Sequence, residues 1–179
     1  MRTDECVALI REGVAGRPGT WADLGSGDGA FTAALAEILG SGTHLVSVDT
    51  NRRALQAQAR ELTPRYPDVR LTTLAGDFTG SLAVPPLDGI LMANSLHFQQ
   101  DTCAVLAHVA RWLKPGGRIV IVEYDVQRAG PWVPTPVPPG GLGKAAACAG
   151  LPAPRLLARR ASRYHGAGGM YSAVLDLRP

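Results

Sequence analysis

The sequence predicts an α/β fold in which helices cover a mainly parallel sheet. Segments typical of helices and of strands alternate along most of the chain, which is the pattern of strand–helix units that pair in parallel. Residues 87–93 form a nearly continuous apolar run, as expected for a strand buried on both faces. A glycine-rich turn at 25–29 joins a predicted strand to a predicted helix, and folds of this class bind ligands at such turns.

The predicted helices carry apolar residues three or four positions apart and end at glycine or proline. In chain order we expect them at 4–14, 30–39, 51–65, 101–113 and 144–149. Asp101 is the expected N-cap of the fourth helix, because its carboxylate can accept from the first free backbone N–H groups.

The predicted strands are short apolar or alternating runs bounded by turn residues. In chain order we expect them at 20–24, 44–49, 69–74, 87–93, 118–123, 155–164 and 170–177. A Lys-Pro-Gly-Gly turn at 114–117 should precede the fifth strand. The Pro-rich stretch at 130–139 is a lid or a rigid connector, and not a domain linker, because the roughly 40 residues after it are too few for a separate core. We therefore expect one domain over residues 1–179.

Composition narrows the class of protein. With 46% hydrophobic and 18% charged residues, the chain of 179 residues should be globular. It lacks both the ~20 uninterrupted apolar residues of a membrane span and the apolar run of a secretory signal. We expect a cytoplasmic protein without a membrane partner.

The spacings of the cysteines and histidines argue against disulfide bonds and metal sites. The cysteines are Cys6, Cys103 and Cys148, an odd number at wide spacings without a Cys-x-x-Cys motif. A disulfide or a zinc site is therefore not expected, and buried free thiols are. The four histidines show no metal-ligand spacing, so no metal is predicted.

Positive charge gathers in the C-terminal part. Residues 126–179 hold seven Lys and Arg against the single Asp176, although the whole chain is only +3. Such a lobe can attract nucleic acid. Aromatic residues are nearly absent from it, however, so an arginine-rich solvated surface is the favoured interpretation and nucleic acid is not the favoured partner.

The turn Gly25-Ser26-Gly27-Asp28-Gly29 also fits the dinucleotide fingerprint G-x-G-x-x-G/A. Asp23 and Asp28 argue against that ligand, because both carboxylates would repel a pyrophosphate. The same carboxylates would attract a sulfonium compound that also carries an α-amino group. No Gly-x-x-x-x-Gly-Lys phosphate loop is present.

Two further acids follow the next two predicted strands. Asp49 could accept both hydroxyls of a ribose, a feature that NAD and sulfonium nucleoside sites share. Asp77 could accept from an adenine amino group while Phe78 packs on the ring, although Asp77 could equally cap a turn. Three acids after three successive strands suit an adenosine ligand without phosphates.

Read in order, these motifs resemble those of class I S-adenosylmethionine (SAM)-dependent methyltransferases. The motifs are the glycine loop at 23–29, Val48-Asp49, Gly76-Asp77-Phe78, the segment 88–94, and Leu113-Lys114-Pro115-Gly116-Gly117-Arg118. The similarity runs from Thr20 to Tyr124, well over half of the chain. It implies a three-layer Rossmann-like fold with a seven-stranded sheet ordered 3-2-1-4-5-7-6, in which strand 7 is antiparallel.

The resemblance also implies a cofactor, SAM, and residues that hold it. The glycines would surround its methionine and ribose part, Asp23 would reach its amino group, Asp49 its ribose, Asp77 with Phe78 its adenine, and Asn94 would border the reaction centre. The full cofactor-binding prediction is Asp23, Gly25, Ser26, Gly27, Gly29, Asp49, Thr50, Asp77, Phe78 and Asn94.

Methyl transfer needs approach geometry above all, and an oxygen or nitrogen acceptor can also need a base. His97 is the candidate catalytic base, since it follows the fourth strand and titrates near neutral pH; a packing role is the alternative. Glu123 is expected to be structural or substrate-positioning.

The residues after the fourth strand, Asn94-Ser95-Leu96-His97, lack the Pro-Pro motif of base-amine methyltransferases. We therefore expect a small-molecule acceptor, and a second copy of the chain is a candidate partner because the chain leaves little room for a substrate domain. Three alternatives stay open: an RNA methyltransferase using Arg155, Arg159, Arg160 and Arg163, a non-catalytic SAM-binding module, and an NAD(P)-binding oxidoreductase.

Overall fold

A computed structural model of the chain describes residues 1–161 and 169–177. Its helices are α1 (Thr3–Val14), α2 (Ala30–Leu39), α3 (Arg52–Arg65), the 3-10 turn η1 (Leu96–Phe98), α4 (Thr102–Ala110) and α5 (Pro139–Cys148). Its strands are β1 (Thr20–Leu24), β2 (His44–Asp49), β3 (Arg70–Ala75), β4 (Leu87–Ala93), β5 (Leu113–Tyr124), β6 (Arg155–Arg160) and β7 (Met170–Asp176). None of these described helices is long and apolar enough to cross a membrane.

The elements lie close to their predicted positions, with three differences. α5 begins at Pro139, five residues before the predicted start, because proline is well suited to the first turn of a helix. The Lys-Pro-Gly-Gly turn at 114–117 falls inside β5, where the pairing with β4 shifts register. β6 ends at Arg160, and the rest of the strand predicted to 164, with Arg163, lies outside the described residues.

The seven strands form a single sheet in the order β3-β2-β1-β4-β5-β7-β6. β1 pairs in parallel with both β2 and β4, and β7 is antiparallel to both of its neighbours. This is the fold predicted from the resemblance. The chain moves outward from β1 to β3 and then returns to the other side of β1 as β4, which makes the β1–β4 junction the switch point of the sheet.

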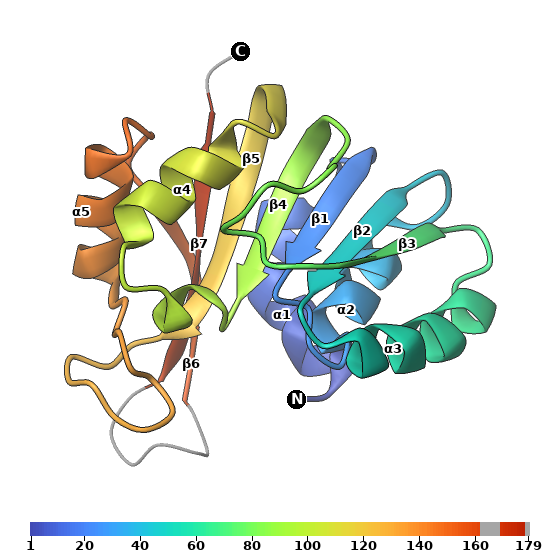
Figure 1. Cartoon of the computed structure of the whole chain (residues 1–179), viewed down its shortest axis with the longest axis horizontal. Helices are drawn as coiled ribbons and strands as arrows, with labels where there is room; N and C mark the ends of the chain where they lie inside the picture. Colours follow the sequence, from blue (N-terminus) through green and yellow to red (C-terminus); the bar gives the residue numbers. More distant parts are fainter. Residues whose placement is uncertain (162–168, 178–179) are drawn as a thin grey trace.

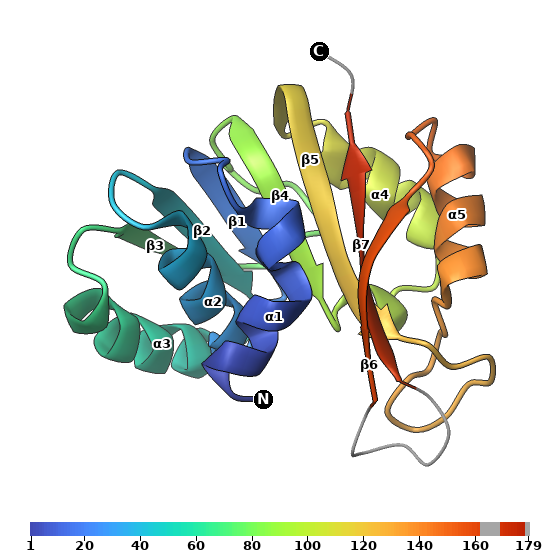
Figure 2. The same ribbon diagram turned by 180° about the vertical axis from the view of Figure 1, so that it is seen from behind.

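Helices cover the two faces of the sheet unequally. α4 and α5 cover the face seen in Figure 1, over a core that includes Ile90, Leu106 and Leu142. α1 and α2 cover the opposite face in Figure 2, over a second core around Ile10 and Trp21. α3 lies at the β2–β3 end of the sheet in both views. The glycine turn therefore starts from a strand that is buried between two cores.

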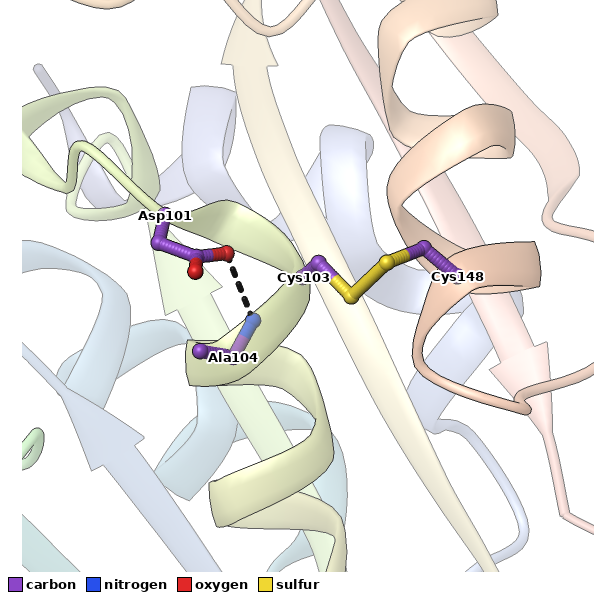
Figure 3. Close-up of a disulfide and its surroundings, with 4 residues drawn as sticks. All are labelled: Asp101, Cys103, Ala104 and Cys148. Atoms are coloured by element: carbon purple, nitrogen blue, oxygen red, sulfur yellow. Dashed lines mark hydrogen bonds between the residues drawn. A yellow bond between two sulfur atoms is a disulfide. The ribbon is translucent and has the colours of Figure 1, made fainter.

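The prediction that all three cysteines are free thiols is wrong for two of them. Cys103 of α4 and Cys148 at the end of α5 form a disulfide, with α-carbons 5.8 Å apart (Figure 3). The cysteines are 45 residues apart in the chain, and only the packing of α4 beside α5 brings them together. Next to it, Asp101 caps α4 as predicted, accepting from the Ala104 backbone N–H at 2.9 Å. Cys6 is free and buried, and burial raises the pKa of its thiol to about 12.

Reduction of this disulfide should destabilise the fold. Cross-linking a loop of this length typically contributes about 2–4 kcal/mol, mainly by restricting the unfolded chain. We expect thermal unfolding to begin at a lower temperature when dithiothreitol is added to the oxidised protein. The Cys148→Ser variant should unfold at the lower temperature with or without reductant. Equal melting temperatures for oxidised and reduced wild type would contradict the prediction.

Candidate cofactor and active site

A cavity of about 740 Å³ lies at the carboxyl ends of β1 and β4. One wall is the glycine turn from Gly25 to Asp28, and Ala93 with Asn94 forms the side that follows β4. The opposite side comes from the start of α1, from Phe31 of α2 and from the β5–β7 region. The cavity therefore occupies the switch point, where the loops after β1 and β4 leave the sheet in different directions.

Backbone hydrogen bonds attach the glycine turn to the end of β2. The N–H groups of Gly25 and Ser26 donate to the Val48 carbonyl, at 2.8 and 3.0 Å. The Gly27 N–H donates to Asp49 Oδ2 at 2.8 Å. Asp49 lies outside the lining but keeps acceptor capacity for a ligand, since a carboxylate offers about four lone-pair sites.

Gly27 is the glycine of the turn that faces open space. Its φ of +55° lies in the left-handed region, and a β-carbon added there would meet no protein atom within 4 Å. Because Gly27 lines the cavity, that open space is ligand space. A larger side chain would strain the backbone and occupy the cavity at once.

Asp23, the last residue but one of β1, is almost fully buried beneath the turn. Its Oδ2 accepts from Thr32 Oγ1 at 2.6 Å, and its Oδ1 has no hydrogen-bond partner among residues 1–161 and 169–177. Burial raises the pKa of Asp23 to about 7; the Thr32 hydrogen bond opposes this, and the charges of Asp49 and Asp28 add to it. The site thus holds a carboxyl group whose ionisation would be favoured by a nearby cation.

Asn94 leaves β4 in an unusual backbone conformation. Its φ of 54° makes it the one non-glycine residue with positive φ in the described parts of the chain. It lines the cavity, and its Oδ1 is buried without a protein partner. The amide oxygen is therefore a candidate acceptor for a ligand N–H group.

Of the other predicted cofactor residues, Ser26 lines the cavity and Gly29, Thr50, Asp77 and Phe78 do not. The Ser26 hydroxyl accepts from Ser47 Oγ at 2.7 Å and so bonds within the protein. The Asp77 carboxylate accepts from the backbone and hydroxyl of Thr79, both at 2.8 Å, which is the turn-capping alternative. Phe78 is packed in the core. Gly29 is the N-cap of α2, and Thr50 is an exposed residue after β2. Their contact with a cofactor stays a prediction.

His97 is buried, with 2% of its surface exposed, and does not line the cavity. Its Nδ1 lies 2.7 Å from Oε2 of the fully buried Glu123. The other oxygen of Glu123 accepts from the backbone N–H groups of Leu96 and His97. This arrangement matches the structural role expected for Glu123, and the base role of His97 stays a prediction.

Sequence reasoning missed the charged residues on the far side of the cavity. Arg2 and Glu5 of the α1 N-terminus and Arg160 of β6 line it, and Arg160 forms an ion pair with Glu5. The hydrogen bond from Arg160, aided by the Arg2 backbone N–H, lowers the pKa of Glu5 to about 2. No local motif marks these residues. β6 lies beside α1 only because it pairs with β7 at the edge of the sheet.

Three of the five basic residues that the structure describes in the C-terminal lobe are paired with acids. Arg155 binds Glu12 at 2.5 Å and Arg159 binds Asp125 at 2.6 Å, in addition to the pair made by Arg160. Each pair uses charge that would otherwise be free for phosphate groups. The pairing therefore weakens the electrostatic argument for RNA.

Residues 22–119 match the family model described as a methyltransferase domain, which is more than half of the chain. The chain belongs to the methyltransferase-domain family. Curated relatives include the demethylmenaquinone methyltransferase of Tropheryma whipplei, 34% identical over 110 residues, which cover 59% of this chain and 42% of that protein. The cypemycin N-terminal methyltransferase of a Streptomyces species is 34% identical over 115 residues, 60% of this chain and 44% of that protein. The chain thus matches less than half the length of these relatives.

Among solved structures, the fold resembles the Burkholderia thailandensis 1,6-didemethyltoxoflavin-N1-methyltransferase, solved with bound 1,6-didemethyltoxoflavin and S-adenosylhomocysteine. The TM-score is 0.73 at 20% sequence identity, over 99% of this chain and 78% of that one. SAM, the cofactor predicted from the sequence, is the cofactor of this methyltransferase class.

The residues of this methyltransferase domain fit that cofactor. SAM carries a sulfonium and an α-amino group and no phosphate, and the protein offers acids and acceptors in matching positions. Asp23 and Asn94 each have a buried oxygen without a protein partner, and Asp49 lies at the end of β2. A pyrophosphate would instead face Asp28 on the cavity wall and Asp23 beneath it, which argues against NAD(P).

The Gly27→Val substitution should abolish SAM binding, because the new side chain fills ligand space. The matched control is Gly42→Val, since Gly42 also has positive φ and open surroundings but lies outside the cavity lining. Both variants should lose about 1–2 kcal/mol of stability from the strained backbone. Isothermal titration calorimetry should detect binding by wild type and Gly42→Val only. Equal affinity in both variants would place the ligand elsewhere.

Asp23→Asn should make the ligand-free protein more stable at pH 8, and the difference should shrink as the pH falls and vanish near pH 4, where the unfolded carboxyl group is also protonated. The folded-state pKa of about 7 lies above the value of about 3.9 in an unfolded chain. Between these values unfolding releases a proton, so wild-type stability falls as pH rises toward 7 and is level above it. Denaturant unfolding at several pH values checks this. A parallel pH profile for both proteins would contradict it.

Proposed function

We propose that residues 1–179 form one domain that transfers the methyl group of SAM to a small molecule. The observation that carries the proposal is the cavity itself. It combines a glycine turn with Asp28 on the wall, open space at Gly27, and the buried Asn94 oxygen, while Asp23 lies beneath the turn outside the lining; within the described residues, Asp23 Oδ1 and Asn94 Oδ1 have no hydrogen-bond partner. This set of groups suits a cationic adenosine compound, and it lies at the switch point of a methyltransferase-domain fold.

The protein's part in this reaction is orientation. Asp49 would hold the ribose hydroxyls, while Asp23 and Asn94 would receive the amino group, which fixes the ligand at two ends. When bound, SAM supplies an activated methyl group on sulfur. In-line transfer of that methyl group to the acceptor would be the chemistry that the bound cofactor supplies. Holding the reacting atoms about 3–3.5 Å apart can provide much of the rate enhancement.

Apolar residues in the cavity lining support a small acceptor with an apolar body. Phe31, Met170 and Ala93 line the cavity, and Tyr124 adds a ring with a polar end. The toxoflavin precursor bound in the Burkholderia relative is a small molecule, which agrees with this choice. His97 is the base that we propose for an acceptor that must lose a proton, and its burial requires that the proton reach it through neighbouring groups.

Ligand-induced stabilisation tests the cofactor directly. SAM and S-adenosylhomocysteine should each raise the melting temperature in proportion to the logarithm of their concentration, because they bind only the folded state. NADH should leave it unchanged. A shift with NADH and none with millimolar SAM would overturn the proposed function.

Asp49→Ala should weaken SAM binding about tenfold or more while the fold is kept, because two hydrogen bonds to the ribose are lost. Asp68→Ala is the control, since Asp68 is an exposed carboxylate on the loop before β3. Calorimetric titration of both variants gives the two dissociation constants. Unchanged affinity in Asp49→Ala would show that the ribose lies elsewhere.

A further inference from the structure

The segment after β4 is held in a strained conformation. A left-handed backbone is unfavourable for residues with a side chain, although less so for asparagine than for most, and surrounding contacts stabilise it. Asn94 adopts this conformation at the first position after β4. Something in the structure must therefore hold the residues that follow Asn94 in place.

Three contacts do so. The Asn94 N–H donates to the Val122 carbonyl at 2.8 Å. Ser95 Oγ donates to the Leu24 carbonyl at 2.7 Å, which attaches the segment to the end of β1. The third contact is Glu123 of β5, which accepts from the Leu96 N–H at 3.0 Å and from the His97 N–H at 3.1 Å.

Glu123 also contacts the side chain of His97. Its second oxygen lies 2.7 Å from His97 Nδ1, and the proposed arrangement has Nδ1 donating to that oxygen. Neither side chain exposes more than 2% of its surface. A buried carboxylate with three donors from residues 96 and 97, and a longer contact of 3.4 Å from the Tyr124 N–H, can fix both the backbone and the ring.

We propose that Glu123 and His97 form a latch that positions Asn94 for the methionine end of SAM. Glu123 is then a positioning residue: it acts through the backbone of 94–97, and Asn94 makes the ligand contact. In this assignment His97 Nδ1 donates to Glu123, so the base role proposed above would fall to Nε2 alone. The inference rests on the proposed function, because SAM is the ligand.

A double-mutant cycle on SAM affinity tests the latch. The variants are Glu123→Gln, Asn94→Ala and the double variant, each titrated with SAM by calorimetry. Glutamine places an N–H₂ group where a carboxylate oxygen accepted, so at least one of the three donors is lost. We expect about a tenfold loss of affinity in each single variant and no further loss in the double variant, because both changes remove the same contact. Independent losses that multiply would overturn the proposal.

The matched control is Asp125→Asn. Asp125 is a carboxylate two residues further along, but it pairs with the exposed Arg159 and not with the segment after β4. It should bind SAM as wild type does. Circular dichroism should show the same helix and strand content in all of these variants, so that a loss of affinity is not a loss of fold.

Substitutions of His97 separate the latch from a catalytic base and from a residue that only packs. In His97→Asn the side-chain amide can donate to Glu123 from nearly the Nδ1 position, and SAM affinity should stay within about twofold of wild type. In His97→Leu no donor remains, and affinity should fall about tenfold. A base would leave SAM affinity unchanged in both, and that result would overturn the proposal even if Glu123→Gln did not fold.

A spectroscopic signature gives a second readout. In wild type, nitrogen-15 NMR of the His97 ring should show a protonated Nδ1, and Glu123→Gln should shift that proton or its resonance. An unprotonated Nδ1 in wild type would overturn the latch. Failure of the proposed function looks different, because wild type itself would then not bind SAM.

Discussion

The site depends on the junction between β1 and β4, where the sheet changes direction. Loops on the two sides of this junction must leave the strands toward opposite faces, and the space between them becomes the cavity. The junction is closely packed: a β-carbon at Gly89 of β4 would lie 2.5 Å from the ring of the buried Trp21 of β1. The absence of a side chain at residue 89 lets the two strands pair beside that ring. The glycine turn and Asn94 follow the carboxyl ends of these two neighbouring strands.

The sequence predicted what is local. Apolar periodicity placed nearly every helix and strand, and the glycine turn identified the ligand-binding end of β1. The order of the sheet came from the succession of motifs, since a parallel α/β chain with this resemblance has few alternatives. Gly25, Gly27 and Asn94 were predicted as cofactor residues and do line the cavity.

What the sequence did not predict is created by long-range packing. Cys103 and Cys148 are a pair only because α4 and α5 cover the same face of the sheet. Glu5 meets Arg160 across 155 positions of the chain, and no spacing rule connects an N-terminal helix to a strand of the closing hairpin. The burial of a single side chain also could not be predicted from the sequence. His97 follows a strand end, as a catalytic base would, but its ring lies in the interior beside Glu123. The types and order of the residues indicated methyl-transfer chemistry. The packing of the fold determines which of their atoms line the cavity.

At Asp23, the stability of the ligand-free protein and the proposed ligand binding make opposite demands on the side chain. A carboxyl group that is buried without a partner for one oxygen destabilises the folded protein once it ionises. A core chosen for stability alone would hold an apolar side chain or a fully bonded amide at this position. Under the proposed function a cationic ligand reverses the balance, because its positive charge favours ionisation and supplies the missing partner. A group that weakens the empty protein therefore strengthens the complex, which makes the cavity selective for cations before any acceptor arrives.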